Sequence, residues 1–289
     1  MIKTIIVFTD YSKQSEHAAK YAIHLAKKIK ANILISDAVI EPNPVYASYD
    51  AGSRSVFETP DDVRKNNRLL KFCDSLENEL VETILSDKFV PAIYCQPAEM
   101  SLIDTARHFE ESLDAAFIML AVSLYYGASS IMAGDTCKKI LASSSTPVIL
   151  VPEDAPIRYT EKYAFVADIN NNNVSTLGKV AELAAYSAAE VMLVNINNGR
   201  PLDKAQEGAL RLIMKETICQ IDYGRIYYRH LPNEILKDDM EWLMQDTRFE
   251  MLVVVHSKNN TIIPLLQFNY NNKIVGNIDV PVLIYPTID

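Results

Sequence analysis

The side chains of this sequence that could do chemistry stand directly after short apolar runs near its start. Thr9, Asp10 and Ser12 follow the run Thr4–Phe8, and Asp37 follows a second run at 33–35. Short oxygen side chains at such positions can accept hydrogen bonds from the free amides of a first helical turn. For Asp10, pinning a turn and binding a ligand therefore remain equal alternatives. We expect Asp37 to be a solvated loop acid.

Histidines and cysteines form no pattern typical of a metal site. His17 and His24 lie two turns apart on one predicted helix, too far to share a metal simply, and we expect the histidines at the surface or at helix ends. The four cysteines lack a CxxC pair, so reduced, mostly structural thiols are expected. Neither GxSxG nor a P-loop is present, and no base stands beside an anion cradle. The sequence predicts no metal and no catalytic residue.

The elements that position these residues alternate between strand and helix. Thr4–Phe8 and 33–35 are predicted strands, and the segment between them repeats apolar residues at helical spacing. The pattern continues with predicted helices at 61–86, 101–111 and 131–142 and predicted strands at 90–96, 115–123 and 147–151. Five strands separated by four helices indicate an open, doubly wound, parallel sheet.

The second half of the chain repeats the first. The same spacing separates Asp10 from Asp37 and Asp168 from Asn195, and the apolar segments 146–152 and 280–286 match each other. In this half we expect helices at 204–220, 233–244 and after 261, and strands at 225–229, 251–256 and 282–285. A repeat near half the chain length indicates tandem domains. The predicted boundaries are domain 1 at 1–152, a linker at 153–161 and domain 2 at 162–289.

The chain resembles the universal stress protein family over both halves. The resemblance rests on the TDYS turn at 9–12, the SEHAAKYAIHLAKK helix at 15–28 and the TPVILVP strand at 146–152. It implies a tandem, Rossmann-like member with two repeated α/β domains. Each would be a five-stranded parallel open sheet of order 3-2-1-4-5 with helices on both faces. One branch of the family binds adenine nucleotides and another binds none.

The resemblance also identifies the segment that distinguishes the branches. Nucleotide-binding members carry Gly-x2-Gly-x9-Gly-Ser/Thr after the fourth strand, where glycines let the backbone approach phosphate and the last pair opens a helix. Counting back from Pro147 leaves one of these glycines, Gly134, and Gly127 lies in the spacer. Asp135 replaces Ser/Thr, and its carboxylate would repel phosphate. Triphosphate binding is therefore not expected in domain 1, while a weak nucleoside or monophosphate site stays open.

The residues that would form this site follow from the same resemblance. Asp10 would lie near adenine and ribose, and the backbone of Ala38 would read adenine. The full predicted set in domain 1 is Thr9, Asp10, Ala38, Gly127, Gly134, Asp135 and Thr136. In domain 2 only Asp168 remains, because Phe268 and Asn269 replace the terminal Gly-Ser, so that half is degenerate. We expect no cofactor, with ATP or AMP in domain 1 as the alternative.

Composition excludes some partners. A net charge of −9 argues against nucleic acid, which needs a basic face. No apolar run approaches about 20 residues, and no signal pattern is present, so the expectation is a cytoplasmic protein without membrane contact.

The apolar strands 148–151 and 282–285 are predicted to lie at the edges of their sheets, where exposed backbone groups and apolar side chains need to be covered. They predict an intrachain pseudo-dimer of the domains, with a homodimer of chains as a further option.

Together these patterns predict a non-catalytic universal stress protein with a stress-response regulatory or binding role, acting through unknown protein partners or a small ligand. The alternative is an adenine-nucleotide sensor that binds through domain 1.

Overall fold

The computed structural model describes residues 2–37, 60–82, 89–122, 135–167, 174–195, 204–230, 248–256 and 279–286. The first half contains β1 (Thr4–Thr9), α1 (Lys13–Ile29), β2 (Asn32–Asp37), α2 (Pro60–Glu82), β3 (Ile93–Cys95), α3 (Leu102–Ser112), β4 (Ala115–Val122), α4 (Asp135–Ser143) and β5 (Val148–Pro152). The second half contains β6 (Lys162–Ala167), α5 (Val174–Ala185), β7 (Glu190–Asn195), α6 (Lys204–Cys219), β8 (Ile226–His230), β9 (Met251–His256) and β10 (Val282–Pro286).

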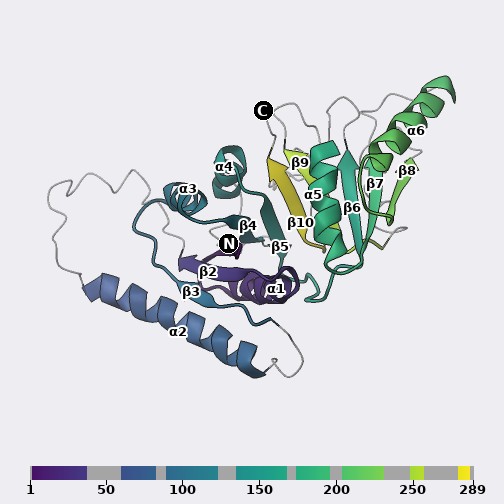
Figure 1. Cartoon of the computed structure of the whole chain (residues 1–289). Coiled ribbons are helices and arrows are strands. Elements are labelled where there is room, and N and C mark those ends of the chain that lie inside the picture. The colour runs from purple at the N-terminus through teal and green to yellow at the C-terminus, as the bar shows by residue number, and fades with distance from the viewer. Residues whose placement is uncertain are drawn as a thin grey trace.

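The strands form one sheet in the order β3-β2-β1-β4-β5-β10-β9-β6-β7-β8. Within each half the pairs are parallel, and the order is the predicted 3-2-1-4-5, which confirms the fold class. The fifth strands of the halves pair antiparallel, with Leu283 opposite Ile149. The sheet therefore runs through both halves without a break (Figure 1).

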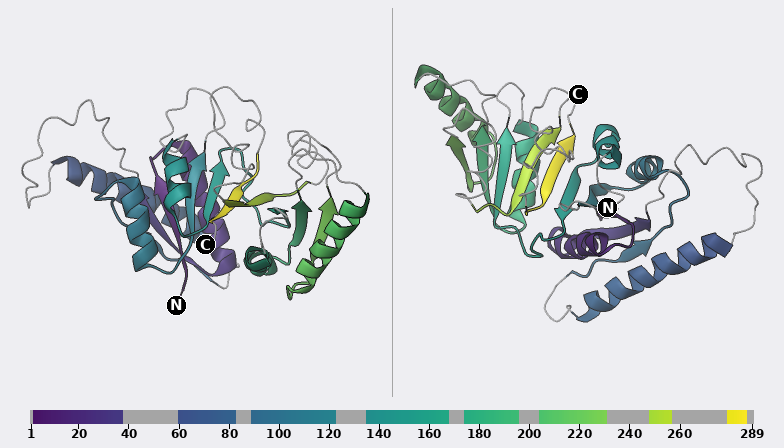
Figure 2. Two further views of the ribbon diagram at one scale, coloured as in Figure 1. Left: turned by 90° about the horizontal axis from the view of Figure 1, so that it is seen from above. Right: turned by 180° about the vertical axis from the view of Figure 1, so that it is seen from behind.

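Helices cover the two faces of this sheet. Buried residues of α1, α2, α5 and α6 share one hydrophobic cluster, and those of α3 and α4 belong to the cluster on the opposite face. The views from above and behind in Figure 2 show the helices of the first half on both sides of the strands. Burial on both faces explains why β1, β2, β4 and β5 read as continuous apolar runs.

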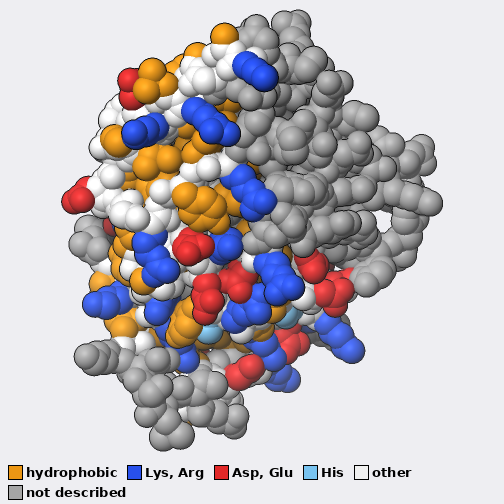
Figure 3. Space-filling view, turned by 90° about the vertical axis from the view of Figure 1, so that its right-hand side faces the viewer, with side chains coloured by type: hydrophobic (Ala, Val, Ile, Leu, Met, Phe, Trp, Pro, Cys, Tyr) orange, Lys and Arg blue, Asp and Glu red, His pale blue; other side chains and the backbone are white. Residues whose placement is uncertain are grey.

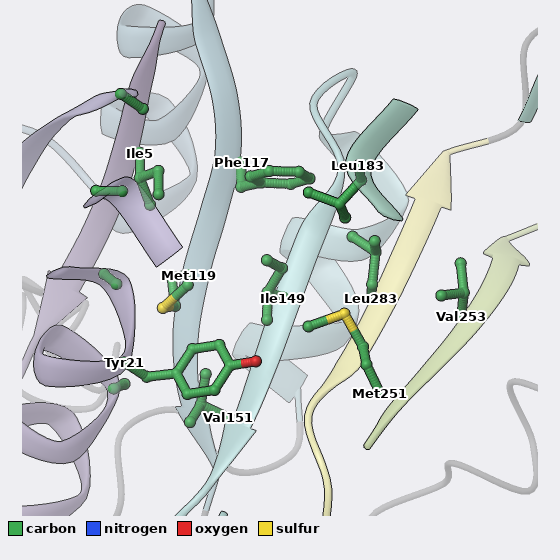
Figure 4. Packing of buried hydrophobic residues seen from close by; sticks show 14 of the residues in the cluster. Ile5, Tyr21, Phe117, Met119, Ile149, Val151, Leu183, Met251, Val253 and Leu283 are labelled. Atoms are coloured by element: carbon green, nitrogen blue, oxygen red, sulfur yellow. The ribbon is translucent and has the colours of Figure 1, made fainter. Parts of the chain in front are cut away.

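The junction between the halves is an apolar core. Ile149 and Leu283 are fully buried, and Figure 4 shows them beside Phe117, Leu183 and Met251. These side chains come from both halves and belong to one cluster. Close packing across the β5–β10 pair therefore continues the hydrophobic core from one half into the other, and the cluster on the opposite face also contains residues of both halves.

Some boundaries differ from those expected from the sequence. Helix α2 begins at Pro60 and its described part ends at Glu82, and β3 is confined to 93–95. The loop 124–130 and the predicted helices at 233–244 and after 261 lie outside the described residues. Among the described helices, none combines the length and the apolar character that crossing a membrane requires.

The prediction of reduced thiols is wrong for two cysteines. Cys73 on α2 and Cys95 at the end of β3 form a disulfide with an S–S distance of 2.04 Å. Sequence spacing alone could not reveal this pair, because it depends on how α2 lies against the sheet edge. Cys137, which is buried, and Cys219, which is exposed, take no part in a disulfide.

Candidate functional site

The turn between β1 and α1 is built from hydroxyl and carboxylate groups that bond one another. The Thr9 Oγ1 atom lies 2.9 Å from the Ser15 Oγ and accepts the amide of Tyr11 at 2.9 Å. Asp10 Oδ1 accepts the amide of Ser12 at 3.0 Å. Ser12 is the N-cap of α1 and accepts the amide of Ser15 at 3.1 Å. Its oxygen therefore satisfies one of the free donors of the first helical turn.

Asp37 lies at the end of the neighbouring strand and is buried, so the expectation of a solvated loop acid is wrong. It stands opposite Thr9 in the β1–β2 register and is 7% exposed. Its Oδ1 accepts the amide of Ala98 at 2.8 Å, in the segment that follows β3. The carboxylate therefore ties the carboxyl end of β2 to the segment beyond β3.

Tyr11 closes one side of this turn and was not anticipated from the sequence. Its φ of 62° is a left-handed conformation, which is strained for a bulky side chain. Its ring meets Phe72 edge-on at 5.8 Å between centroids, and the guanidinium of Arg68 lies 4.2 Å from the ring centroid. Burial, with the charge of Asp37 as a second cause, raises the pKa of Tyr11 to about 12. Among the described residues, its buried hydroxyl finds no hydrogen-bond partner.

The structure places only part of the predicted site. Thr9 is fully buried and Asp10 is half-buried at the end of β1. Asp135 and Thr136 form the start of α4, and their side chains lie outside the described residues, as do Ala38, Gly127 and Gly134. In the second half, Asp168 is also outside the description. The nucleotide site therefore stays a prediction, of which Thr9 and Asp10 are the two side chains with a described environment.

Two histidines lie elsewhere than expected. His17 lies in the second turn of α1 and His24 farther along the same helix, and both are half-buried and face the segment that joins the halves. His17 Nε2 donates to the Ala155 carbonyl at 2.7 Å, and the ring of His24 lies with its centroid 4.1 Å from that of Tyr159, tilted by 30°. The expectation of surface or helix-end positions is wrong for this pair. A metal role has no support in the described part of the chain, which holds no group of three potential ligands.

These histidines belong to a polar stripe on α1 that runs along the linker. Gln14 donates to Glu153 at 2.6 Å, and Lys28 Nζ lies 4.4 Å from the centre of the Tyr159 ring. Tyr21 is buried between them and hydrogen bonds to Thr160. A cavity of about 20 Å³, enough for one water, lies along this stripe. The stripe residues, which recur at helical spacing, are Gln14, His17, Tyr21, His24 and Lys28.

A second hollow opens at the amino ends of the strands in the second half. It has a volume of about 460 Å³ and is lined by both acidic and basic side chains. Glu190 lies 3.7 Å from Lys162 and 3.9 Å from Arg225, and Glu250 lies 2.9 Å from Arg158. Figure 3 shows positive and negative side chains interspersed on this side of the molecule. The opposed charges pair with one another, which is typical of a solvated surface.

Comparison with known proteins identifies the family of the first half and the fold of the whole. A sequence model described as the Universal stress protein family matches residues 1–152. A search of curated protein sequences finds no match.

Solved structures cover nearly the whole chain. A universal stress protein from Archaeoglobus fulgidus DSM 4304 superposes with a TM-score of 0.64 at 12% identity, over 99% of this chain and 97% of that one. A functionally unknown protein, PA1789 from Pseudomonas aeruginosa PAO1, gives 0.57 at 12% identity, over 99% and 92%. The cytoplasmic domain of a prokaryotic cation chloride cotransporter gives 0.56 at 8% identity, over 98% and 95%. At these identities the likeness concerns the fold alone.

Proposed function

We propose that this chain, which belongs to the universal stress protein family, is a non-catalytic binding protein with a regulatory role in the stress response. Its effect would be exerted through protein partners, and the nucleotide motif of the family would be largely lost.

The observation that carries this proposal is the state of the polar groups at the carboxyl ends of β1 and β2. The Thr9 hydroxyl is bonded to Ser15 and to the Tyr11 amide, and the Asp37 carboxylate accepts the Ala98 amide. These groups hold the local fold together. A general base or nucleophile must instead reach a substrate. Their use inside the fold supports a structural rather than a catalytic role.

The alternative function is an adenine-nucleotide sensor in domain 1. It is favoured by Asp10, whose half-buried carboxylate is fixed by the Ser12 amide at the end of β1. The start of α4 at Asp135 adds backbone amides on which an anion can bind, although the Asp135 carboxylate opposes it. A nucleoside or monophosphate would meet less of this repulsion than a triphosphate.

Calorimetric titration decides between these functions. The purified protein, first tested for carried-over nucleotide, is titrated with ATP, ADP, AMP and adenosine, with and without magnesium. If the regulatory function is right, we expect no nucleotide to bind with a dissociation constant below about 1 mM, which corresponds to a binding free energy near −4 kcal/mol. One equivalent bound at about 1 μM, near −8 kcal/mol, would replace it by the sensor.

A matched pair of variants makes any measured binding interpretable. Asp10→Asn keeps an oxygen that can accept the Ser12 amide but removes the charge, so the turn should persist. Asp74→Ala removes an exposed carboxylate of α2 and serves as the control. Binding through the predicted site should weaken in Asp10→Asn alone. Equal weakening in both variants, or in neither, would place the ligand elsewhere.

The pairing of β5 with β10 bears on assembly. This intrachain contact uses the strand edges through which separate domains would otherwise pair. We therefore propose that the tandem chain is its own pseudo-dimer and that any homodimer uses another surface. Sedimentation equilibrium against the monomer mass of 32.5 kDa tests the second part.

A further inference from the structure

The disulfide joins the outermost elements of the first half. Cys73 is 2% exposed in the middle of α2, and Cys95 is half-buried at the end of β3. Among the strands that the structure describes, β3 is at the edge of the sheet and pairs with β2. The disulfide therefore links α2 to a short edge strand, which is hydrogen-bonded to the sheet on one side through β2.

The same helix holds the turn that carries Asp10. Phe72 is adjacent to Cys73 and meets the Tyr11 ring edge-on, and Arg68 lies one turn earlier over the same ring. Tyr11 stands between Asp10 and the Ser12 amide that bonds it. A continuous set of contacts thus runs from Cys95 through Cys73 and Phe72 to Tyr11.

Tyr11 is strained, so its position depends on what packs against it. A left-handed non-glycine residue persists only where its surroundings enforce that conformation, and such residues gather at ligand sites and switches. Phe72 and Arg68 supply part of that enforcement, and both are on α2. A change in how firmly α2 is held should therefore reach the Asp10 turn.

We propose that the Cys73–Cys95 disulfide is a thiol–disulfide exchange site whose substrate is a dithiol, and that its reduction loosens α2 and frees Tyr11 from the turn that holds Asp10. In the cytoplasm, where the sequence predicts this protein, disulfides are usually transient or redox-sensing, which fits this role. The proposal does not depend on nucleotide binding.

The chemistry begins at the more accessible sulfur. A thiolate of the dithiol attacks Cys95 Sγ, the S–S bond breaks, and Cys73 leaves as a thiolate that takes up a proton. The second thiol of the reductant loses its proton and attacks the mixed disulfide, which releases Cys95 as a thiolate that is then protonated. The protein gains two electrons and two protons, and the dithiol becomes a cyclic disulfide.

Reduction should loosen the helix without detaching it completely. Leu69, Leu76 and Leu80 are buried on the inner face of α2, and Glu79 of the same helix pairs with Lys20 at 3.0 Å. These contacts remain after the covalent link is lost. The expected effect is a larger population of locally open states rather than unfolding.

Hydrogen exchange measured by mass spectrometry on the full chain, before and after dithiothreitol, tests the first step. Amides of α2 and β3 should exchange at least about tenfold faster after reduction. The double variant Cys73→Ser/Cys95→Ser should exchange at the reduced rate with or without dithiothreitol. Cys219→Ser, which alters an exposed free thiol, should respond like the wild type. Unchanged protection of α2 after complete reduction would overturn the proposal.

The direction of attack has its own test. In Cys73→Ser the half-exposed Cys95 should form a mixed disulfide with oxidised glutathione, whereas in Cys95→Ser the buried Cys73 should react at least about tenfold more slowly. Equal rates in the two single variants would contradict attack at Cys95.

Tyrosine-selective ¹³C NMR at neutral pH tests the coupling to the turn. The ring signal of Tyr11, assigned by its loss in Tyr11→Phe, should move on reduction, because the ring-current contact with Phe72 changes. The double serine variant should show the moved signal without reductant. A Tyr11 signal that stays fixed while α2 exchange accelerates would show the disulfide to be a plain structural link, and the proposed coupling would be wrong.

Discussion

The two halves fasten the same outer helix in different ways. In the first half, α2 is bonded to β3 through Cys73–Cys95. In the second half, the corresponding helix α6 ends in Cys219, which is exposed and free. There the region is held by packing and by the Tyr223 hydroxyl, which donates to the Ala189 carbonyl. The two halves thus share the same topology, but the outer helix is attached by a disulfide in the first half and by packing and a hydrogen bond in the second.

The first helix of each half also differs. Helix α1 carries a polar stripe that binds the linker, including the bonds from Gln14 to Glu153 and from His17 to Ala155. Helix α5 is shorter, and its buried residues are nearly all apolar. The first helix of one copy therefore contacts the linker in addition to covering its sheet, whereas in the second half the linker is bonded by Ser187, which follows α5, and by Glu250. The fold of one unit tolerates this asymmetry because most residues of the stripe lie beside the apolar face of α1, and Tyr21 is the stripe residue that also packs in the hydrophobic cluster.

The largest effect should come from the core that the halves share. Leu283→Ala removes a fully buried side chain opposite Ile149 and should lower the free energy of unfolding by about 2–5 kcal/mol. Because the side chain packs between both halves, calorimetry should show the loss in a transition that both share. Leu212→Ala, at a position 58% exposed on α6, is the control and should change stability by less than about 0.5 kcal/mol. A variant in which only the second half melts early would show that the halves fold independently.

The next effect tests the difference between the outer helices directly. Replacing Cys73 and Cys95 by serine should cost about 2–4 kcal/mol in urea unfolding, because the unfolded chain regains the entropy of a closed loop. Cys219→Ser should cost nothing measurable. If both variants lost the same stability, or neither did, the contrast between the halves would be wrong.

The sequence predicted the elements whose signal is local. The apolar runs of β1, β2, β4 and β5 predict buried strands, and Ser12 and Ser101 have the chemistry of the helix caps that the structure shows. Such signals are complete within a few residues, so one sequence suffices to recognise them. The strand order of both halves was instead implied by the resemblance to the universal stress protein family, and the observed sheet has that order.

The features that the sequence did not reveal depend on distant neighbours. Asp37 is buried because it bonds Ala98, and His17 is partly buried because the linker lies over α1. The contacts of Tyr11 with Phe72 join positions far apart in the chain. Nothing within a window of ten residues carries this information. The predicted residues with described side chains at the candidate site, Thr9 and Asp10, are those set by the local turn.

Alkaline pH should reveal how much of the stability lies at the junction. Burial raises the pKa of Tyr21 to about 12 and also raises the pKa values of Tyr163 and Tyr285. A pKa higher in the folded than in the unfolded state means that the stabilisation is complete below about pH 10 and declines as pH rises toward 12. For Tyr21 the loss is about 2–3 kcal/mol.

Urea unfolding between pH 8 and 11 measures the first part of this loss, which for Tyr21 is about 1.4 kcal/mol by pH 11. Tyr21→Phe should flatten the decline, whereas Tyr94→Phe, at a position 54% exposed on β3, should leave the curve of the wild type unchanged. A curve with the same slope in Tyr21→Phe as in the wild type would show that Tyr21 does not contribute to the alkaline loss of stability.

The smallest expected effect concerns the polar stripe that distinguishes α1 from α5. His17→Ala removes the donor to Ala155 and should cost about 1 kcal/mol, because the carbonyl loses a hydrogen bond that is only partly shielded from water. His17→Gln can place an amide donor near the same carbonyl and should recover part of the lost stability. The control is His108→Ala, on the exposed side of α3, which should leave the free energy of unfolding unchanged. Hydrogen exchange at Arg158, whose amide bonds Pro156 within the linker, should accelerate in His17→Ala and not in His108→Ala. If the Arg158 amide exchanged at the same rate in both variants, packing alone would hold the linker. The polar stripe would then distinguish the sequences of α1 and α5 but not their roles in fixing the linker.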